Sequence, residues 1–291
     1  MLSAWLSFLL FVFSINLPQP GAAGAFGNTF LSTRPIVRSY QSNIEGVKLT
    51  AQAAAAVDLA SGQYLYAYNI DEVRPIASLT KLMTALVFLE NNPGWDKEVV
   101  VGRADEVSKA KYIYRGEKVR VKDLFFVSLI ASDNNATMAL ARSTGLSREE
   151  FIANMNNKAK ELGLADTKFE DITGLSENNV STVRDLIKLG MVVWQNPDII
   201  AATSQQRYLL SVGGRQRAVI STNKMFNNFI QVKAAKTGYT EEAGYCFFAR
   251  VAGDQGDILS IALGSDSEES RFQDVKVLSW WVLNNFIWPS T

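Results

Sequence analysis

Two side chains that can do chemistry together, Ser78 and Lys81, open the stretch "ASLTKLMTALVFLE" at residues 77–90. The small polar residues at its start give way to a helix-period apolar pattern, and residues three apart on a helix face the same way. An amine beside a hydroxyl in a desolvated pocket can act as its base, because burial lowers the proton affinity of the ammonium. The stretch therefore predicts a buried helix with a serine nucleophile and a lysine base at its mouth.

The Ser-x-x-Lys spacing alone is weak evidence of catalysis, because it also begins at Ser108 and at Ser221. A serine N-cap followed by a surface lysine is ordinary helix punctuation. Ser78 differs from the other two in being followed by "SDN" at residues 132–134, between two predicted helices, and by "KTG" at residues 236–238, at the end of a predicted strand. Each of these could be a plain turn or strand end. The three together, in this order, are the constellation of the active-site-serine penicillin-recognising enzymes.

The chain of 291 residues has no histidine. Ser-His-Asp triads, Cys-His pairs, zincin helices and two-His iron sites all need imidazole, because its proton affinity suits work near neutral pH. All four are excluded. A hydrolase built from this chain that uses a covalent intermediate must take its base from a carboxylate, a tuned lysine or an amine terminus.

The composition predicts one globular domain, with 47% hydrophobic and 20% charged residues. Lys+Arg and Asp+Glu both number 29, and no basic run suits a phosphate backbone, so nucleic acid is not an expected partner. The single cysteine, Cys246, lies in the apolar run "YCFFARVA" and is expected to be a buried strand thiol. It can form neither an internal disulfide nor a thiolate metal cage.

The N-terminus indicates location rather than fold. Residues 1–25 contain the apolar run "SAWLSFLLFVFSI" and small residues that offer a cleavage point, so we interpret them as a signal peptide for export. No Lys or Arg precedes the apolar run, and an uncleaved N-terminal anchor is the alternative interpretation. Residues 26–50 show little periodicity and are expected to form a linker or irregular arm. Residues 51–291 are then the catalytic domain.

Beyond that arm, strand and helix signals alternate without an internal repeat. A hairpin is predicted over residues 51–70, because three tyrosines alternate there as a half-buried strand requires. The remaining predicted strands are 97–102, 117–121, 231–239, 243–252 and 257–264, and the predicted helices are 121–131, 136–144, 147–164, 181–196 and 269–288. Strands at both ends with helices between them predict an α+β domain whose sheet joins N- and C-terminal strands.

Four stretches resemble one family, the low-molecular-mass penicillin-binding proteins, which are serine D-alanyl-D-alanine carboxypeptidases and endopeptidases of the peptidase S11 type. They are "RPIASLTKLMTA", "SDNNAT", "DITGLSENNVSTVRDLIKL" and "AAKTGYTEEAGYCF". The resemblance implies a DD-peptidase/β-lactamase-like fold, with an antiparallel sheet flanked by helices and an active site between the sheet edge and an all-helical region. It also implies export to the periplasm or another extracytoplasmic cell-wall space.

The resemblance assigns the catalytic steps to three side chains. Ser78 would be the nucleophile that attacks the carbonyl of a terminal D-Ala-D-Ala bond, Lys81 would be its base, and Ser132 would relay a proton to the leaving amine. Two neighbouring lysines disfavour each other's charge, which agrees with a neutral Lys81. This chemistry needs no metal and no organic cofactor.

The same resemblance assigns substrate binding. Asn134 would bond the backbone amide of the substrate and help to hold Lys81, while Lys236 and Thr237 would bind the terminal carboxylate. The partners implied are peptidoglycan stem peptides ending in D-Ala-D-Ala, with β-lactam antibiotics as covalent inhibitors.

The resemblance also implies an oxyanion hole, formed by the backbone N–H groups of Ser78 and Tyr239. Two fixed donors aimed at a developing charge are what such a site requires. Gly238 would let the substrate lie against the strand as an extra β-pairing, since a side chain there would block close approach.

Alternatives to a carboxypeptidase remain open at this point. The chain ends soon after its last helix and so resembles the short endopeptidase-like members, which makes cleavage of D-Ala-to-diamino-acid crosslinks an alternative. A class A β-lactamase would need a glutamate in an E-x-x-x-N loop, but the residue four after Glu170 is Gly174. A non-catalytic penicillin or peptidoglycan sensor would not need the intact motif triplet. Finally, "WWVLNNFIW" at residues 280–288 could touch a membrane through its aromatic rings, although packing on the sheet is the favoured interpretation.

Overall fold

The described part of the chain is defined by a computed structural model, which covers residues 36–37, 46–226, 229–254 and 256–288. The predicted signal peptide, residues 1–25, lies outside the described residues, as does most of the predicted arm. Of that arm, strand β1 (Ile36–Val37) pairs with β13 (Phe286–Ile287). Thr50 donates from its backbone N–H and its hydroxyl to the carboxylate of Asp274, at 2.9 and 2.8 Å. The end of the arm is therefore tied to the C-terminal part of the fold.

A five-stranded antiparallel sheet lies at the centre, in the order β10-β11-β12-β2-β3. Its strands are β2 (Ala53–Asp58), β3 (Tyr64–Tyr68), β10 (Val232–Thr240), β11 (Gly244–Val251) and β12 (Ile258–Ser265). The N-terminal hairpin joins the C-terminal strands through β2 and β12, as the sequence predicted. All residues of these two strands are buried, because both faces of the sheet are covered. Strand β10 is left at an edge.

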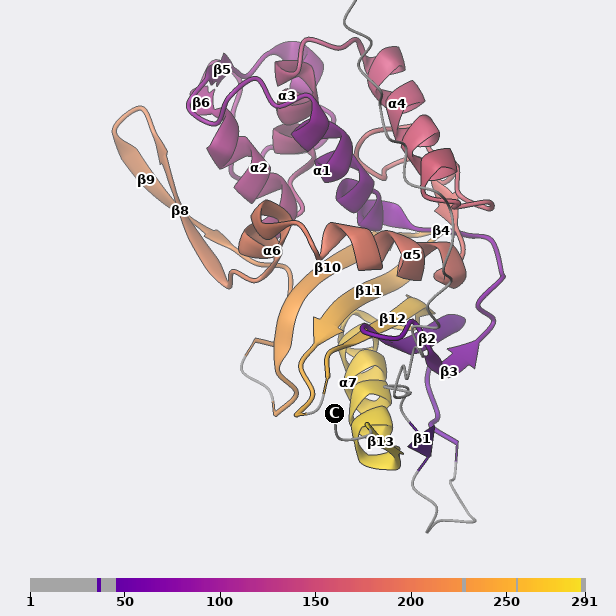
Figure 1. Cartoon of the computed structure of the whole chain (residues 1–291). Helices are drawn as coiled ribbons and strands as arrows, with labels where there is room; N and C mark the ends of the chain where they lie inside the picture. The colour runs from indigo at the N-terminus through magenta and orange to yellow at the C-terminus, as the bar shows by residue number, and fades with distance from the viewer. Residues whose placement is uncertain (1–35, 38–45, 227–228, 255, 289–291) are drawn as a thin grey trace, which may run out of the picture. The chain divides into compact units, whose positions relative to one another are not determined.

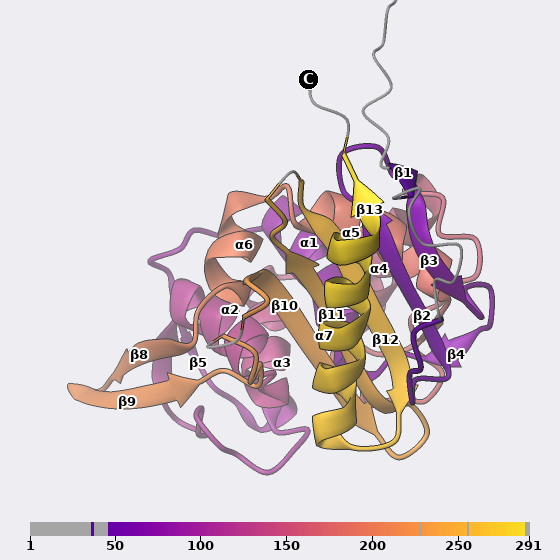
Figure 2. The same cartoon turned by 90° about the horizontal axis from the view of Figure 1, so that it is seen from below.

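Helices cover both faces of this sheet (Figures 1 and 2), so the predicted α+β class is confirmed. Helix α7 (Glu268–Asn285) packs on β11 and β12, and α5 (Val183–Val193) packs on β12 and β2 from the other side. The other helical elements are η1 (Ala77–Leu79), α1 (Thr80–Glu90), η2 (Arg103–Asp105), α2 (Val121–Ile130), α3 (Asn134–Ser143), α4 (Arg148–Glu161) and α6 (Pro197–Thr203). Helices α1 to α4 form the predicted helical region beside the sheet (Figure 1).

Side-chain caps determine where several helices begin. Ser147 accepts a hydrogen bond from the Glu150 N–H, and the Glu150 carboxylate accepts one from the Ser147 N–H, which forms the capping box of α4. Asp133 caps α3 by accepting from the Ala136 N–H at 2.8 Å. The central residue of "SDN" is therefore a helix cap, and the residues on either side of it, Ser132 and Asn134, both line one pocket.

Three strand pairs form small two-stranded sheets separate from the central sheet. They are β4 (Arg74–Pro75) with β7 (Val180–Ser181), β5 (Glu98–Val100) with β6 (Lys118–Arg120), and β8 (Arg207–Val212) with β9 (Arg215–Ile220). The β8–β9 hairpin projects from the rest of the domain near α2 (Figures 1 and 2). The Tyr208 hydroxyl donates to Asp123, and the Tyr208 ring stacks on Phe126 with centroids 4.9 Å apart. The sequence analysis had assigned no structure to this segment.

The C-terminal aromatic run packs mainly on the sheet. The Trp281 ring meets Tyr66 edge-on at 6.0 Å, and Trp288 is buried, whereas Trp280 is half-exposed. Within the described residues, no helix combines the length and apolar character that crossing a membrane would require. Cys246 is buried in β11, so its expected place in a strand core is confirmed.

The contact between α5 and the sheet depends on a glycine. A Cβ on Gly190 would lie 2.3 Å from Cζ of Phe248, a ring that is fully buried and packed on Trp194 with centroids 4.5 Å apart.

We predict that Gly190→Ala lowers the free energy of unfolding by about 1–3 kcal/mol through overpacking, measured by chemical denaturation. This loss should outweigh the gain in helix propensity of about 1 kcal/mol. A smaller loss in a Phe248→Leu background is the control, and a stabilised Gly190→Ala protein would contradict the prediction.

Candidate active site

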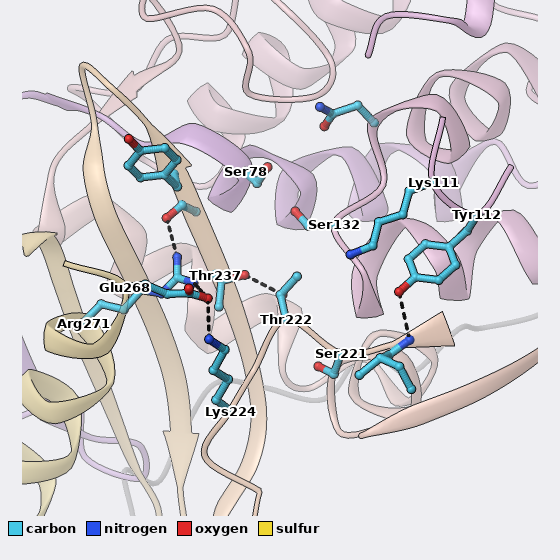
Figure 3. A pocket seen from close by; sticks show the side chains of 14 residues that line it. Ser78, Lys111, Tyr112, Ser132, Ser221, Thr222, Lys224, Thr237, Glu268 and Arg271 are labelled. Atoms are coloured by element: carbon cyan, nitrogen blue, oxygen red, sulfur yellow. Dashed lines mark hydrogen bonds and ion pairs between the residues drawn. The ribbon is translucent and has the colours of Figure 1, made fainter. Parts of the chain in front are cut away.

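All eight predicted site residues meet at one pocket of about 420 Å³ beside the edge strand β10 (Figure 3). Six of them line it: Ser78, Ser132, Asn134, Thr237, Gly238 and Tyr239. The other two, Lys81 and Lys236, are almost completely buried and bond to the two serines. The lining also contains residues that the sequence analysis had not assigned to the site, namely Lys111, Tyr112, Ile220, Ser221, Thr222, Lys224, Glu268 and Arg271.

Ser78 lies in the short turn η1, just before α1 begins at Thr80, and not in the α-helix itself. The residue before it, Ala77, has a positive φ of 46°. A non-glycine residue in this region costs roughly 1–3 kcal/mol and persists only where the surroundings hold it there. Two glycines make that possible. A Cβ on Gly174 would lie 2.0 Å from the Ala77 carbonyl oxygen, and one on Gly238 would lie 3.0 Å from that of Ile76.

Lys81 is fully buried, and its Nζ has three acceptors within hydrogen-bond distance. They are Ser78 Oγ at 2.9 Å, Asn134 Oδ1 at 2.7 Å and the Thr173 carbonyl oxygen at 2.6 Å. Burial lowers the pKa of Lys81 to about 7, against the opposing effect of the Asp171 and Asp133 carboxylates. The three bonds thus hold an amine that can be neutral near physiological pH against the hydroxyl of Ser78.

The loop that supplies the Thr173 carbonyl was quoted in the sequence analysis but given no role. It is organised by Asp171, which accepts from the Thr173 hydroxyl at 2.6 Å and from the Gly174 N–H at 2.8 Å. Asn179 donates to Asp171 Oδ1 at 2.7 Å and to the hydroxyl of Thr80 at 3.1 Å. This network fixes the loop to the start of α1. Only the fold could reveal it, since the bonds from this loop to Thr80 and Lys81 join residues 99 and 92 positions apart.

Ser132 and Lys236 form the second serine–lysine contact of the site. Lys236 is 1% exposed and donates to Ser132 Oγ at 2.8 Å and to the Thr237 carbonyl at 2.9 Å. Burial, together with the positive charges of Lys81 and Arg271, lowers the pKa of Lys236 well below its usual value. Ser132 itself has a φ of 57°, the second strained non-glycine backbone at this site.

Strand β10 supplies the remaining predicted residues. The Thr237 and Thr222 hydroxyls share a hydrogen bond of 2.6 Å, which adds Thr222 to the expected set. The sequence analysis expected Gly238 to leave room for substrate, whereas its Cβ direction points at the turn of Ser78, whose N atom would be 3.3 Å away. Tyr239 is half-exposed, and its ring stacks on Tyr245 with centroids 4.3 Å apart.

A charged cluster lies at the start of α7, on the same side of the pocket as Thr237 (Figure 3). Arg271 is buried and donates to the Gly238 carbonyl at 3.1 Å. Glu268 pairs with Lys224 at 2.9 Å and with Arg271 at 3.4 Å. Among the described residues that line the pocket, Glu268 is the one acid, and it is held by these two cations.

Comparison with known proteins gives one consistent result. The family model for D-alanyl-D-alanine carboxypeptidases, Peptidase S11, matches residues 39–267. The chain is 35% identical to a D-alanyl-D-alanine endopeptidase of Haemophilus influenzae over 199 residues, covering 67% of this chain and 68% of that protein. It is 31% identical to a D-alanyl-D-alanine carboxypeptidase of Bacillus subtilis, covering 76% of this chain and 59% of that protein.

The solved structures agree with the sequences. Penicillin-binding protein D2 of Listeria monocytogenes, in its cefotaxime-bound form, superimposes with a TM-score of 0.73 at 32% identity, covering 82% of this chain and 99% of that one. The family match spans most of the chain and includes all the residues that meet at the pocket except Glu268 and Arg271. The chain therefore belongs to the D-alanyl-D-alanine carboxypeptidase family of serine peptidases.

Proposed function

We propose that this protein is a D-alanyl-D-alanine carboxypeptidase that acts on peptidoglycan stem peptides through an acyl-enzyme on Ser78. The observation that carries the proposal is the 2.9 Å contact between Ser78 Oγ and a buried Lys81 whose pKa is lowered to about 7. A base with a pKa near the working pH combines a populated neutral form with useful proton affinity. The activities named for the relatives supply the substrate class.

Acylation begins with Lys81 in its amine form. The Ser78 hydroxyl then donates its hydrogen bond to Nζ and passes its proton there as Oγ attacks the D-alanyl carbonyl carbon. Negative charge develops on the carbonyl oxygen, and the backbone N–H groups of Ser78 and Tyr239 are the proposed donors to it. The packing of Gly238 against the turn of Ser78 brings these two backbone segments close together.

Loss of the leaving group needs a proton on its nitrogen. Ser132 is the proposed relay: its hydroxyl gives a proton to the leaving nitrogen as it takes up the one that Lys81 accepted from Ser78, so that both lysines end the step as they began it. Lys236 Nζ, 2.8 Å from Ser132 Oγ, holds this hydroxyl in place. Lys236, Thr237 and Thr222 are the proposed ligands of the terminal carboxylate, because a cation and paired hydroxyls suit an anionic chain end. Water then hydrolyses the acyl-enzyme and releases the shortened peptide.

β-Lactams are proposed to acylate the same serine and to leave it slowly. Glu170, the residue considered for a β-lactamase-like deacylation, pairs with Lys168 at 2.6 Å and does not line the pocket. The acid that does line the pocket, Glu268, is occupied by two cations. Neither carboxylate is therefore placed to activate water against the ester. An intact serine–lysine arrangement equally argues against a silent sensor.

A second candidate function is the D,D-endopeptidase. It is favoured by the relatives, because the chain is 35% identical to the Haemophilus endopeptidase and 31% identical to the Bacillus carboxypeptidase. Both reactions break the bond after a D-alanine and differ only in the leaving group.

We also propose that the protein works in the periplasm or another extracytoplasmic cell-wall space after export by residues 1–25, because its substrate is cell-wall peptide.

The first prediction concerns the covalent intermediate. Benzylpenicillin should add one penicilloyl group to the full chain, and the adduct should persist for many minutes, because Glu268, the one acid among the described residues of the lining, is held by two cations. Intact mass spectrometry over time, with Ser78→Ala as the control that forms no adduct, makes the measurement. Consumption of penicillin with an adduct that vanishes within seconds would indicate a β-lactamase, and the absence of any adduct would contradict the proposed chemistry.

The second prediction concerns the base. Below pH 7 the rate of penicillin acylation should rise roughly tenfold per pH unit, and it should level off above the Lys81 pKa of about 7, because only the neutral amine accepts the serine proton. Lys81→Arg keeps its positive charge and should acylate roughly 10²–10⁴-fold more slowly at every pH. A thermal melt checks that the variant is folded. Undiminished acylation of a folded Lys81→Arg protein would exclude Lys81 as the base.

The third prediction separates the two candidate activities. The protein should release D-alanine from a stem peptide that ends in D-Ala-D-Ala, and mass spectrometry of the products detects the loss. A crosslinked dimer incubated in parallel should yield monomers if the endopeptidase reaction is also catalysed. Cleavage of the dimer with no release of D-alanine would replace the carboxypeptidase by the second candidate.

A further inference from the structure

One wall of the pocket comes from two elements that the proposed reaction has not used. Lys111 and Tyr112 lie in the loop 107–117, while Ile220 is the last residue of β9 and Ser221 follows it directly. Figure 3 shows Lys111 and Tyr112 across the pocket from Thr237, with the Lys111 side chain pointing inward on the side of Ser132. This wall therefore faces the strand that is proposed to bind the carboxylate.

The wall is a built structure, because several contacts join its two elements. Arg217 on β9 pairs through both ends of its guanidinium with Glu117, and it also donates to the Tyr112 carbonyl at 2.8 Å. Its guanidinium lies over the Tyr114 ring, 4.8 Å from the centroid. The Ile220 N–H donates to the Tyr112 hydroxyl at 3.4 Å, as the dashed line in Figure 3 marks. The hairpin thus holds the loop in place at the rim of the pocket.

Lys111 differs from the other cations of the pocket in its partners and its exposure. Lys224 and Arg271 share Glu268, and Lys236 is buried against Ser132. Lys111 is exposed, its Nζ lies 5.0 Å from the centroid of the Tyr112 ring, and no ion pair among the described residues includes it. The wall therefore offers one exposed positive charge without a carboxylate partner in the described part of the chain.

Lys111 lies on the side of the pocket where the leaving group is expected to depart. Ser132 is the proposed donor to the leaving nitrogen, so the departing chain lies on its side of the scissile bond. A leaving D-alanine ends at its carboxylate, which the proposed ligands Thr237 and Thr222 already accommodate, and it has nothing further to bind. The leaving group of a crosslink is a second stem peptide, which continues beyond that carboxylate and has further carboxylates of its own. Lys111 lies where such a chain can continue.

We propose that Lys111 forms a subsite for a carboxylate on the leaving strand of a crosslinked stem peptide. This inference rests on the proposed acyl-enzyme chemistry and adds a substrate class to it, namely crosslinked peptides with an anionic leaving strand. The subsite favours such crosslinks over their neutral counterparts, because an ammonium and a carboxylate attract each other at the rim of a pocket.

The test uses the full chain and three synthetic substrates. Two are crosslinked dimers identical at the scissile bond and at the carboxylate beside it, one with free and one with amidated carboxylates further along the leaving strand. The third is a pentapeptide ending in D-Ala-D-Ala. Lys111→Met should lower kcat/KM for the free-carboxylate dimer about fivefold, the size expected for one exposed ion pair. It should lower kcat/KM for the other two substrates by a smaller factor.

Matched variants and salt complete the test. Lys111→Arg keeps the charge and should retain the preference, and Lys109→Met, which removes an exposed lysine of the same loop that does not line the pocket, should behave as the wild type. The preference of the wild type for the free-carboxylate dimer should shrink as salt screens the pair. Equal losses on all three substrates, or equal turnover of the two dimers by the wild type, would overturn the subsite.

Two measurements keep this outcome separate from that of the proposed function. Penicillin acylation on the same preparations reports whether Ser78 and Lys81 work at all, and its absence in the wild type would overturn the function itself. If neither dimer is cleaved, the rate of penicillin acylation of Ser78 is measured in the presence of each dimer instead, because a bound dimer slows that acylation. The subsite is then overturned if the free-carboxylate and amidated dimers compete with penicillin equally well, or if Lys111→Met leaves the competition unchanged.

Discussion

The site depends on a lysine, Lys81, that is buried without an ion pair to any carboxylate in the described part of the chain. Moving an ammonium out of water is costly, so a lysine in this position either forms an ion pair or loses its proton more easily. The two acids whose charges act on Lys81 are engaged elsewhere, since Asp171 accepts hydrogen bonds from its own loop and Asp133 caps helix α3. What remains are a hydroxyl, an amide oxygen and a carbonyl oxygen, all of which suit an amine that switches charge near neutral pH.

The scaffold around this lysine is arranged to hold a strained turn. Ala77 and Ser132 both have positive φ, and each lies beside a residue of the proposed mechanism or is one itself. Neither backbone would keep this conformation alone. Gly174 packs directly against the turn from one side, Gly238 of the edge strand packs from another, and the buried helix α1 fixes its end. The same packing that stabilises the core thus aims Ser78 at the edge of the sheet.

The sequence predicted the larger elements because their signals are local. Apolar periodicity, a serine cap and turn residues specify the hairpin of β2 and β3 and the helices α1 and α4 without reference to the rest of the chain. The three motifs, with Tyr239 beside the third, likewise contain the eight predicted residues that meet at the pocket, but not the other residues of its lining. Strands β8 and β9 gave no such signal, because their exposed face is mixed and their stability comes from Tyr208 and Arg217 contacting distant residues. Thr173 contributes only a backbone carbonyl, for which no residue type is diagnostic.

The two other Ser-x-x-Lys segments show why spacing and position must be considered together. Ser108 to Lys111 and Ser221 to Lys224 are not buried at the start of a helix, so their lysines keep access to water. Yet Lys111, Ser221 and Lys224 all line the same pocket as Ser78. One sequence pattern therefore supplies different chemistry according to burial. A buried lysine can give up its proton to become a base, whereas an exposed one remains a cation suited to attracting the anionic ends of cell-wall peptides.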